Sequence, residues 1–409
     1  MQSVSASTDL SPLGVLHALQ MVLHTVTCVG TGGKESSQRA ALLLVSELPA
    51  ALVGLIKESF IKKLLKWPEQ CGGGPDTSNR AVTLVARILL LPFESSNCGE
   101  GGTTEPQGTD MENLQTSLLS LGLMHNMVRV LGNCNRNATE RVMVLLSRMI
   151  MLPGGRFAIQ YVESGGLNQQ LVHSLLDINN RPGLIVDSLI ILSMLARISR
   201  DYSPAIHKAD AYDKLLTLLQ NSNDPTVKAR VCNFVGNICR HSDFFYSSLQ
   251  QSGVMDEVIQ CASDQDPNTR KFACFALGNA AFHSATLYRG LKNAIGPLVS
   301  CLSEPLEKTR SNAAGALGNL VRNSELLATD LASSGAVAAL IQASDPPSGV
   351  DGSSRVALYS LGTVAAYEDC KDVIVGSGFT TQLQSLAQNK DRTTAKYAAR
   401  VLDRLSPQQ

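Results

Sequence analysis

The sequence predicts an all-α protein in which a helical unit of about forty residues repeats along the chain. Four stretches resemble one another, each with a glycine before a polar residue: FVGNICR, ALGNAAF, ALGNLVR and SLGTVAA. Their glycines, Gly236, Gly278, Gly318 and Gly362, lie 42, 40 and 44 residues apart. Self-similarity at such a period in a helical pattern is typical of stacked helical repeats.

Length and composition favour the same architecture. The chain has 409 residues, whereas a single compact core stops growing at roughly 250–300 residues. A repeat stack avoids this limit because each unit packs only on its neighbours. Aromatic residues make up 5% of the chain, so the core is built from Leu, Ala, Val and Ile. Strand-like segments are almost absent from the sequence. We therefore expect a right-handed armadillo/HEAT-like α-solenoid of about nine repeats.

The nine units follow from aligning the small residue that precedes the asparagine position. The aligned residues are Ser46, Ala86, Ser147, Ala196, Gly236, Gly278, Gly318, Gly362 and Ala399. Residues 94–110 have almost no apolar side chain, and we predict a disordered insertion because they cannot bury enough surface to fold. The prediction is one continuous solenoid, with degenerate helical repeats at 1–153 and regular repeats at 154–409.

Apolar periodicity and turn residues place the elements. In the degenerate part, helices are expected at 13–29, 39–48, 50–67, 80–91, 112–132 and 140–152, with a flexible connection at 71–79. Ser-Gly pairs recur before the second helices of later units. Pro and Asp recur before the third helices, in NDPTVKAR, DQDPNTRK and SEPLEKTR. Proline at a helix start costs little because its missing N–H would have no partner there.

Projection onto a helix divides each repeated stretch into two sides. In residues 270–283, the packing side holds Ala273, Leu277 and Ala280, and its equivalents are apolar: Val231, Val235, Ile238; Ala313, Leu317, Leu320; Ala357, Leu361, Val364. The opposite side is mixed and mostly polar: Asn233, Asn237, Arg240; Phe275, Asn279, Phe282; Gly315, Asn319, Arg322; Tyr359, Thr363, Ala366. In a solenoid this second side forms a continuous row, a kind of surface often used for binding.

The pattern resembles the armadillo-repeat family over roughly residues 155–409, and more weakly before them. The resemblance implies that the third helix of each unit lines a groove. It also implies that Asn237, Asn279 and Asn319 hydrogen-bond the backbone of an extended peptide. An amide side chain offers both a donor and an acceptor, which suits a peptide group. Alternatively, these asparagines are solvated polar residues or hydrogen-bond between repeats, and both interpretations stay open.

The sequence departs from the nuclear-import adaptors of this family, which carry tryptophan four residues before the asparagine. Those positions here hold Asn233, Phe275, Gly315 and Tyr359, which argues against binding of nuclear-localisation signals. Arginines beside the row, Arg148 included, favour an acidic or phosphorylated partner, or else form ordinary surface and inter-repeat ion pairs. The candidate peptide-binding residues are Asn237, Asn279, Asn319, Phe275, Tyr359, Arg197, Arg240 and Arg322.

Other classes of function are disfavoured. The 35 basic and 35 acidic residues lack the basic excess of a nucleic-acid surface, and no apolar run approaches the ~20 residues of a membrane span. No hydrolase, metalloprotease, dinucleotide or kinase motif is present, so we expect no catalytic residue, metal, cofactor or small-molecule substrate. The ten cysteines lack CxxC spacing, and we interpret Cys232, Cys239, Cys274 and Cys301 as apolar core residues. His241 and His283 are interpreted as helix ends.

A narrower resemblance rests on NDPTVKARVCNFVGNICRHSDFFY, DPNTRKFACFALGNAAFHS and EPLEKTRSNAAGALGNLVRNS. These stretches look like the C-terminal armadillo region of Fused-type serine/threonine kinases. The resemblance implies a parent ATP-dependent kinase whose catalytic domain precedes the repeats and is absent from this chain. It also implies roles in Hedgehog signalling and motile cilia. The expected function is a non-catalytic scaffold for protein partners with extended or acidic segments, in the cytoplasm or cilium; the alternative is a regulatory or docking region of such a kinase.

Overall fold

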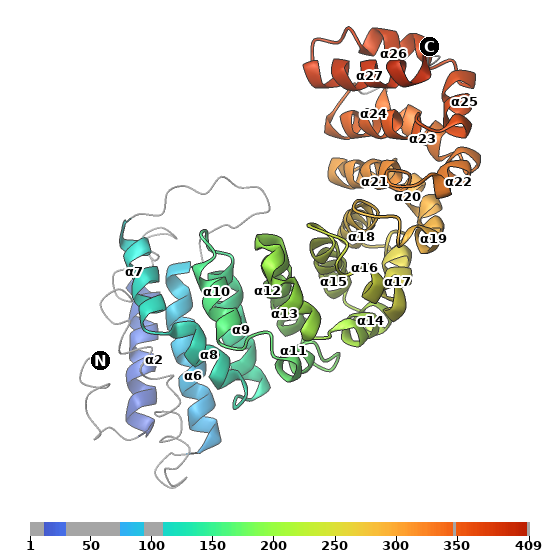
Figure 1. The fold of residues 1–409 in the computed structure, drawn as a ribbon. Helices are drawn as coiled ribbons and strands as arrows, with labels where there is room; N and C mark the ends of the chain where they lie inside the picture. The colour runs from blue at the N-terminus through green and yellow to red at the C-terminus, as the bar shows by residue number, and fades with distance from the viewer. Residues whose placement is uncertain (1–11, 30–73, 94–108, 347–348, 407–409) are drawn as a thin grey trace. The chain divides into compact units, whose positions relative to one another are not determined.

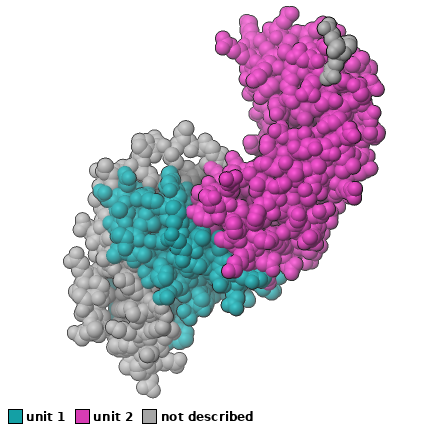
Figure 2. All heavy atoms as spheres, viewed as in Figure 1, with its two compact units in different colours: residues 1–194 teal, residues 195–409 magenta. Residues whose placement is uncertain are grey.

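The computed structural model describes residues 12–29, 74–93, 109–346 and 349–406. Every regular element within these ranges is a helix (Figure 1), which confirms the predicted all-α class. The chain divides into two compact units, Met1–Met194 and Leu195–Gln409 (Figure 2). The predicted boundary after residue 153 marks where the repeats become regular, which is a different criterion, and it stays a prediction.

Unit 1 contains long helices that pack on one another in sequence order: α2 contacts α6, and α6 contacts α9. Its elements are α2 (Pro12–Val29), α6 (Pro75–Leu90), η3 (Leu91–Phe93), α7 (Thr109–Ser120), α8 (Leu123–Leu131), α9 (Arg136–Ile150), α10 (Arg156–Glu163), α11 (Gln169–Leu175) and α12 (Pro182–Ile198), inside which the division between the units falls.

Unit 2 is a stack of helical triplets. The first and second helices of the triplets are η4 (Arg200–Tyr202), α13 (Ser203–Lys208) and α14 (Tyr212–Asn221); α16 (Tyr246–Ser252) and α17 (Val254–Cys261); α19 (Tyr288–Leu291), η5 (Lys292–Ala294) and α20 (Ile295–Cys301); η6 (Glu325–Leu327), α22 (Ala328–Ser333) and α23 (Ala336–Ser344); α25 (Glu368–Gly376) and α26 (Thr380–Leu386). The third helices are α15 (Pro225–Ile238), α18 (Pro267–Ala280), α21 (Glu307–Asn319), α24 (Gly352–Val364) and α27 (Arg392–Leu405). Each third helix packs on the next, and together they lie on one side of the stack (Figure 1).

The predicted repeat alignment is confirmed for eight of its nine positions. The aligned residues from Ala86 to Ala399 each lie in one of the helices α6, α9, α12, α15, α18, α21, α24 and α27. Ser46 lies outside the described residues, as do the helices predicted at 39–48 and 50–67. The regular spacing therefore corresponds to one long helix per repeat.

The division of these helices into two sides is also confirmed. All twelve apolar residues predicted to pack inward are at most 5% exposed. The glycines of the motif allow the third helices to approach closely: a Cβ placed on Gly318 would lie 2.6 Å from Ser360 Oγ and 3.0 Å from Ser360 Cα. Ser360 Oγ in turn donates to the Ala314 carbonyl across the same contact, at 2.8 Å.

The recurring Ser-Gly pair marks the turn between the first and second helices of a repeat. Gly165, Gly253, Gly335 and Gly378 have φ values of +86°, +73°, +79° and +73°, a left-handed conformation that side chains disfavour. Two triplets lack this glycine: between α13 and α14 Asp210 has a left-handed φ of +48°, and between α19 and α20 the 3-10 helix η5 (Lys292–Ala294) joins the two helices.

Two predicted boundaries were wrong. Residues 75–79 were predicted to be a flexible connection, but Pro75 begins α6 and Asn79 Nδ2 donates back to the Pro75 carbonyl at 2.7 Å. The single helix predicted at 112–132 is two helices, α7 and α8, broken at Gly122, whose φ is +69°. The prolines predicted before the third helices are found there: Pro225 and Pro267 begin α15 and α18, and Pro305 lies just before α21, which begins at Glu307.

The predicted disordered insertion lies almost entirely outside the described residues. Thr109 and Asp110 are the exception, because they form the first turn of α7.

We expect Gly318→Ala to lower the free energy of unfolding by about 1–3 kcal/mol, because the added methyl group overlaps Ser360 at the contact between α21 and α24. Gly315→Ala is the matched control in the same helix: its added Cβ meets only Val356 Cγ1, at 3.6 Å. Since glycine inside a helix costs about 0.5–1 kcal/mol relative to alanine, that control should stabilise the protein. Urea unfolding measures both. Equal effects of the two substitutions would contradict the close-approach explanation.

Candidate functional site

Seven of the eight predicted site residues lie on α15, α18, α21 and α24 or directly follow one of them. We call the polar side of these helices the third-helix face. It consists of Asn233, Asn237, Arg240, Phe275, Asn279, Phe282, Gly315, Asn319, Arg322, Tyr359, Thr363 and Ala366. Arg197, the eighth predicted residue, is at the end of α12 and exposed.

The asparagine row joins successive repeats. Asn279 Nδ2 donates to the Gly236 carbonyl of the preceding third helix at 2.8 Å, and Asn319 Nδ2 donates to the Gly278 carbonyl at 2.9 Å. Asn237 differs, because it is 5% exposed and donates within its own helix, to the Asn233 carbonyl at 2.9 Å. Asn279 and Asn319 therefore have the inter-repeat role that the sequence left open.

This structural role leaves part of each amide for a ligand. An asparagine side chain has two donor hydrogens and an acceptor oxygen, and the bond to the preceding repeat takes one donor. Both Asn279 and Asn319 are half-buried rather than buried. Their role in peptide binding stays a prediction.

Buried tyrosines hold the backbone of the same asparagines. Tyr246 donates its hydroxyl to the Asn279 carbonyl and Tyr288 donates to the Asn319 carbonyl, each at 2.5 Å. Burial raises the pKa of Tyr246 and Tyr288. Both phenols therefore stay neutral donors near neutral pH, and the asparagine row rests on a fixed backbone.

The two candidate histidines also join repeats. His241 Nε2 donates to the Arg197 carbonyl at 3.1 Å, and His283 Nε2 donates to the Arg240 carbonyl at 3.0 Å. At the equivalent position one repeat later, Asn323 Nδ2 donates to the Phe282 carbonyl at 3.0 Å. These carbonyls lie at the C-terminal ends of helices, where backbone acceptors lack partners inside the helix. The helix-end interpretation of His241 and His283 is confirmed.

Phe275 stands where nuclear-import adaptors carry tryptophan, and its ring packs against Gly236 of the preceding helix so closely that a side chain there would overlap it. It is half-buried in this inter-repeat contact. The structure thus gives Phe275 a packing role, whereas Tyr359 at the equivalent position in α24 belongs to a more open cluster.

That open cluster alternates arginine and aromatic side chains across four repeats. The Arg322 guanidinium carbon lies 4.2 Å from the centre of the Phe282 ring, and that of Arg400 lies 4.6 Å from the centre of the Tyr359 ring. Tyr397 stands edge-on to Tyr359, with 5.3 Å between the ring centres. These geometries fit cation–π and aromatic contacts. We call these five residues the arginine–aromatic cluster.

The sequence reasoning missed Arg400, Tyr397 and Phe282 as site residues. A signal for Arg400 was present, because it follows Ala399 and so occupies the asparagine position of the last repeat. In α24 that position holds Thr363, whose Oγ1 accepts from Arg400 Nη2 at 3.4 Å. The last repeat therefore has the cationic side chain of Arg400 at the position where Asn237, Asn279 and Asn319 have an amide.

A separate set of cations stabilises the stack. Each pairs a third-helix residue with an acidic residue shortly before the next third helix. The pairs are Lys228–Asp264 at 3.9 Å, Arg270–Glu304 at 2.7 Å, Arg310–Asp351 at 2.6 Å and Arg355–Asp391 at 3.7 Å. Burial alone would raise the pKa of Asp351, but hydrogen bonds from Ser353, Ser354 and Arg310 hold it well below its usual range.

Three of the predicted site arginines and Arg400 do not belong to this set. Within the ranges that the structure describes, Arg197, Arg240, Arg322 and Arg400 form no ion pair with an acidic side chain. Arg240 and Arg322 are exposed and Arg400 is half-buried. The inter-repeat ion-pair alternative therefore does not apply to Arg197, Arg240 and Arg322.

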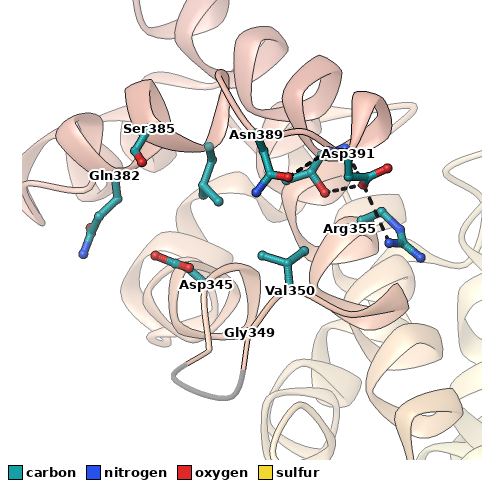
Figure 3. Close-up of a pocket in the computed structure, with 10 residues that line it drawn as sticks. Asp345, Gly349, Val350, Arg355, Gln382, Ser385, Asn389 and Asp391 are labelled. Atoms are coloured by element: carbon teal, nitrogen blue, oxygen red, sulfur yellow. Dashed lines mark hydrogen bonds and ion pairs between the residues drawn. The ribbon is translucent and has the colours of Figure 1, made fainter.

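A cavity of about 480 Å³ lies between the last two repeats (Figure 3). Three of its polar lining residues have structural partners: Asp391 accepts from the backbone N–H of Thr394 at 3.0 Å and pairs with Arg355. Asn389 Oδ1 accepts from the Asp391 N–H at 2.9 Å. The cavity is therefore a polar crevice between repeats, without a set of converging reactive groups.

No group of three or more metal-ligating side chains occurs among the described residues. Cys232, Cys239, Cys274 and Cys301 are buried, in agreement with their interpretation as core residues. None of the described helices alone could cross a membrane by length and apolar composition; one bent pair, Glu325–Ser333 with Ala336–Ser344 at 78°, would qualify on those two criteria.

Comparison with known proteins agrees with the fold and the repeats. The family model of the armadillo/β-catenin-like repeat matches residues 292–322. The crystal structure of an engineered protein superimposes with a TM-score of 0.67 at 18% identity, covering 94% of this chain and 98% of that one. A designed armadillo repeat protein in complex with the peptide (KR)4 superimposes with a TM-score of 0.53 at 20% identity, covering 58% of this chain and 99% of that one.

The fold, the triplets and the asparagine row define this chain as an armadillo-repeat protein. Among curated proteins, it is 27% identical over 446 residues to the serine/threonine-protein kinase TIO of Arabidopsis thaliana, covering 99% of this chain and 33% of that protein. It is 26% identical over 332 residues to serine/threonine-protein kinase 36 of Mus musculus, covering 76% of this chain and 23% of that protein. The chain thus resembles the C-terminal region of Fused-type kinases at distant identity, and it spans a third or less of their length.

We expect Asn279→Ala to lower the free energy of unfolding by about 1–3 kcal/mol, because it leaves the buried Gly236 carbonyl without the amide that it accepts from. Asn268→Ala, in the exposed first turn of the same helix, is the matched control and should change stability by less than about 0.5 kcal/mol. Thermal and urea unfolding measure both. If the Asn279 variant were as stable as the control, the bond between repeats would not contribute.

Proposed function

We propose that this chain is a non-catalytic scaffold that binds an extended protein segment along the third-helix face of unit 2. One observation carries the proposal: a row of half-buried amides, flanked by exposed arginines, runs over successive third helices on a rigid backbone. A repeating row of polar groups matches the repeating peptide groups of an extended chain. The designed armadillo protein bound to (KR)4 supports the proposal as a precedent for this fold.

The sign of charge distinguishes this face from one suited to a basic peptide. Arg240, Arg322 and Arg400 contribute positive charge, and within the described residues none of them pairs with an acidic side chain. Like charges disfavour a Lys/Arg-rich segment, whereas guanidinium groups bind carboxylates and phosphates well. The partner we propose is therefore an acidic segment, and the chain takes no small-molecule substrate or cofactor.

We further propose that the scaffold acts as a docking or regulatory region associated with a serine/threonine kinase. The two similar kinases, TIO and kinase 36, support this, since the chain corresponds to only part of each. By the same resemblance we propose a cytoplasmic and ciliary location, and roles in Hedgehog signalling and motile cilium assembly.

A random peptide library tests the binding face without requiring the partner to be identified first. Peptides selected on the full chain should be acidic and extended. Arg240→Glu on the third-helix face should weaken their binding at least about tenfold, because it replaces an attractive charge with a repulsive one. Arg289→Glu, on the exposed surface of α19, changes the net charge equally and should leave binding within about twofold. Fluorescence anisotropy gives the affinities.

The opposite pattern would refute the proposal. If the selected peptides bound Arg240→Glu as tightly as the unaltered chain, the third-helix face would not be the binding surface.

A further inference from the structure

We propose that the arginine–aromatic cluster, Phe282, Arg322, Tyr359, Tyr397 and Arg400, is a binding site for a phosphorylated serine or threonine carried by an extended protein segment. The inference rests on the proposed function, because the segment that runs along the third-helix face would present this side chain. It specifies that one residue of that segment is a phosphorylated serine or threonine.

The two guanidinium groups converge on one point. Arg322, which follows α21, and Arg400, from α27, both lie near the phenol of Tyr359 in the helix between them, and the Arg400 guanidinium carbon is 4.6 Å from the centre of the Tyr359 ring. The proximity of Arg322, and then that of Arg400, lowers the pKa of Tyr359 despite its partial burial. The surroundings of the phenol oxygen thus favour negative charge.

The aromatic rings hold both arginines in position. Arg322 lies over Phe282 at 4.2 Å and Arg400 lies over Tyr359 at 4.6 Å. Gly362 leaves room for the Arg400 stem, since a Cβ there would meet Arg400 Cγ and Cδ at 3.3 Å. Side chains that are already ordered lose less conformational entropy when a ligand binds. The cluster is therefore preorganised.

Charge selects a phosphate over a carboxylate. Two arginines converge here, and within the residues that the structure describes neither has an acidic partner. A carboxylate would neutralise one of them, whereas a phosphate monoester carries about −1.5 to −2 charge at pH 7 and offers three acceptor oxygens. Arginine binds such oxygens through two parallel N–H donors. A single phosphate bridging Arg322 and Arg400 is thus the best electrostatic match.

The site is open to a ligand. Arg322 is exposed, Phe282 is 38% exposed, and Tyr359, Tyr397 and Arg400 are half-buried. Thr363 on α24 and Ala366 just after that helix are small side chains on the same face. The cluster lies on the same face as Asn319, so one extended segment could contact both.

Three oriented peptide libraries test the site on the immobilised full chain. They share random flanking positions and differ at one fixed central residue: phosphoserine, serine or glutamate. We expect at least about tenfold greater retention of the phosphoserine library than of the serine library, with glutamate between them. Arg322→Gln with Arg400→Gln should abolish the difference, whereas Arg289→Gln with Lys292→Gln, which removes two charges from α19 and η5, should preserve it.

Two further variants separate binding from folding. Tyr359→Phe keeps the ring and both arginines but removes the phenol oxygen, so phosphoserine preference should persist. Arg322→Gln alone changes an exposed side chain, and should reduce the preference without shifting the melting temperature. A loss of preference only in variants that also melt early would overturn the proposal.

The outcomes distinguish this inference from the proposed function. Equal retention of the serine and phosphoserine libraries, still sensitive to Arg240→Glu, would overturn the phosphate site and leave the binding face intact. Equal retention of glutamate and phosphoserine would assign the cluster to carboxylates and overturn it too. Phosphoserine preference that survives loss of both arginines would place the site elsewhere, and absence of retention for every library would reject both proposals.

Discussion

Unit 2 depends on the close approach of successive third helices. Glycine at the centre of each repeated motif brings a neighbouring helix within van der Waals contact, as Ser360 lies against Gly318. That distance lets Asn279 and Asn319 reach the carbonyls of the glycines one repeat earlier, Gly236 and Gly278. The Gly-Asn pair is thus one device: the glycine of one repeat supplies space and an acceptor, and the asparagine of the next repeat supplies the donor.

The sequence predicted this architecture well because its cause is periodic. A forty-residue period and an apolar side at helical spacing were enough to identify the helix class, eight of the nine aligned repeats and the buried residues. The breaks between helices and the starts of helices were harder to predict from the sequence. Gly122 separates α7 from α8 within an apolar pattern that reads as one helix, because a left-handed glycine changes direction without changing composition. Pro75 begins α6 from within a glycine-rich segment that resembled a linker.

The sequence predicted on which side of its helix each site residue lies, but not the group to which that residue hydrogen-bonds or with which it forms an ion pair. The sequence placed Asn279 on the polar side of its helix, yet only the structure gives the acceptor one repeat away. It placed Arg240 and Arg322 among arginines with ordinary ion-pair alternatives. The structure separates them from Arg270 and Arg310, which pair with Glu304 and Asp351. Arg400 occupies the position of Asn319 in the last repeat, but that repeat has alanine in place of the glycine, and the sequence gives no sign of the aromatic ring that Arg400 contacts one repeat earlier.

Holding the stack and selecting a ligand are divided between different positions of the same helices. The asparagines contribute neutral amides that suit any peptide backbone, and the bond to the preceding repeat fixes their orientation. We propose that charge selectivity falls to the positions beside them, where this chain has arginines and the aromatic rings that contact them. A designed protein of the same fold is seen with a basic peptide, so the fold itself does not determine the sign of the ligand. We propose that in this chain the charge of the ligand is determined by side chains such as Arg322 and Arg400, which form no inter-repeat ion pair among the described residues.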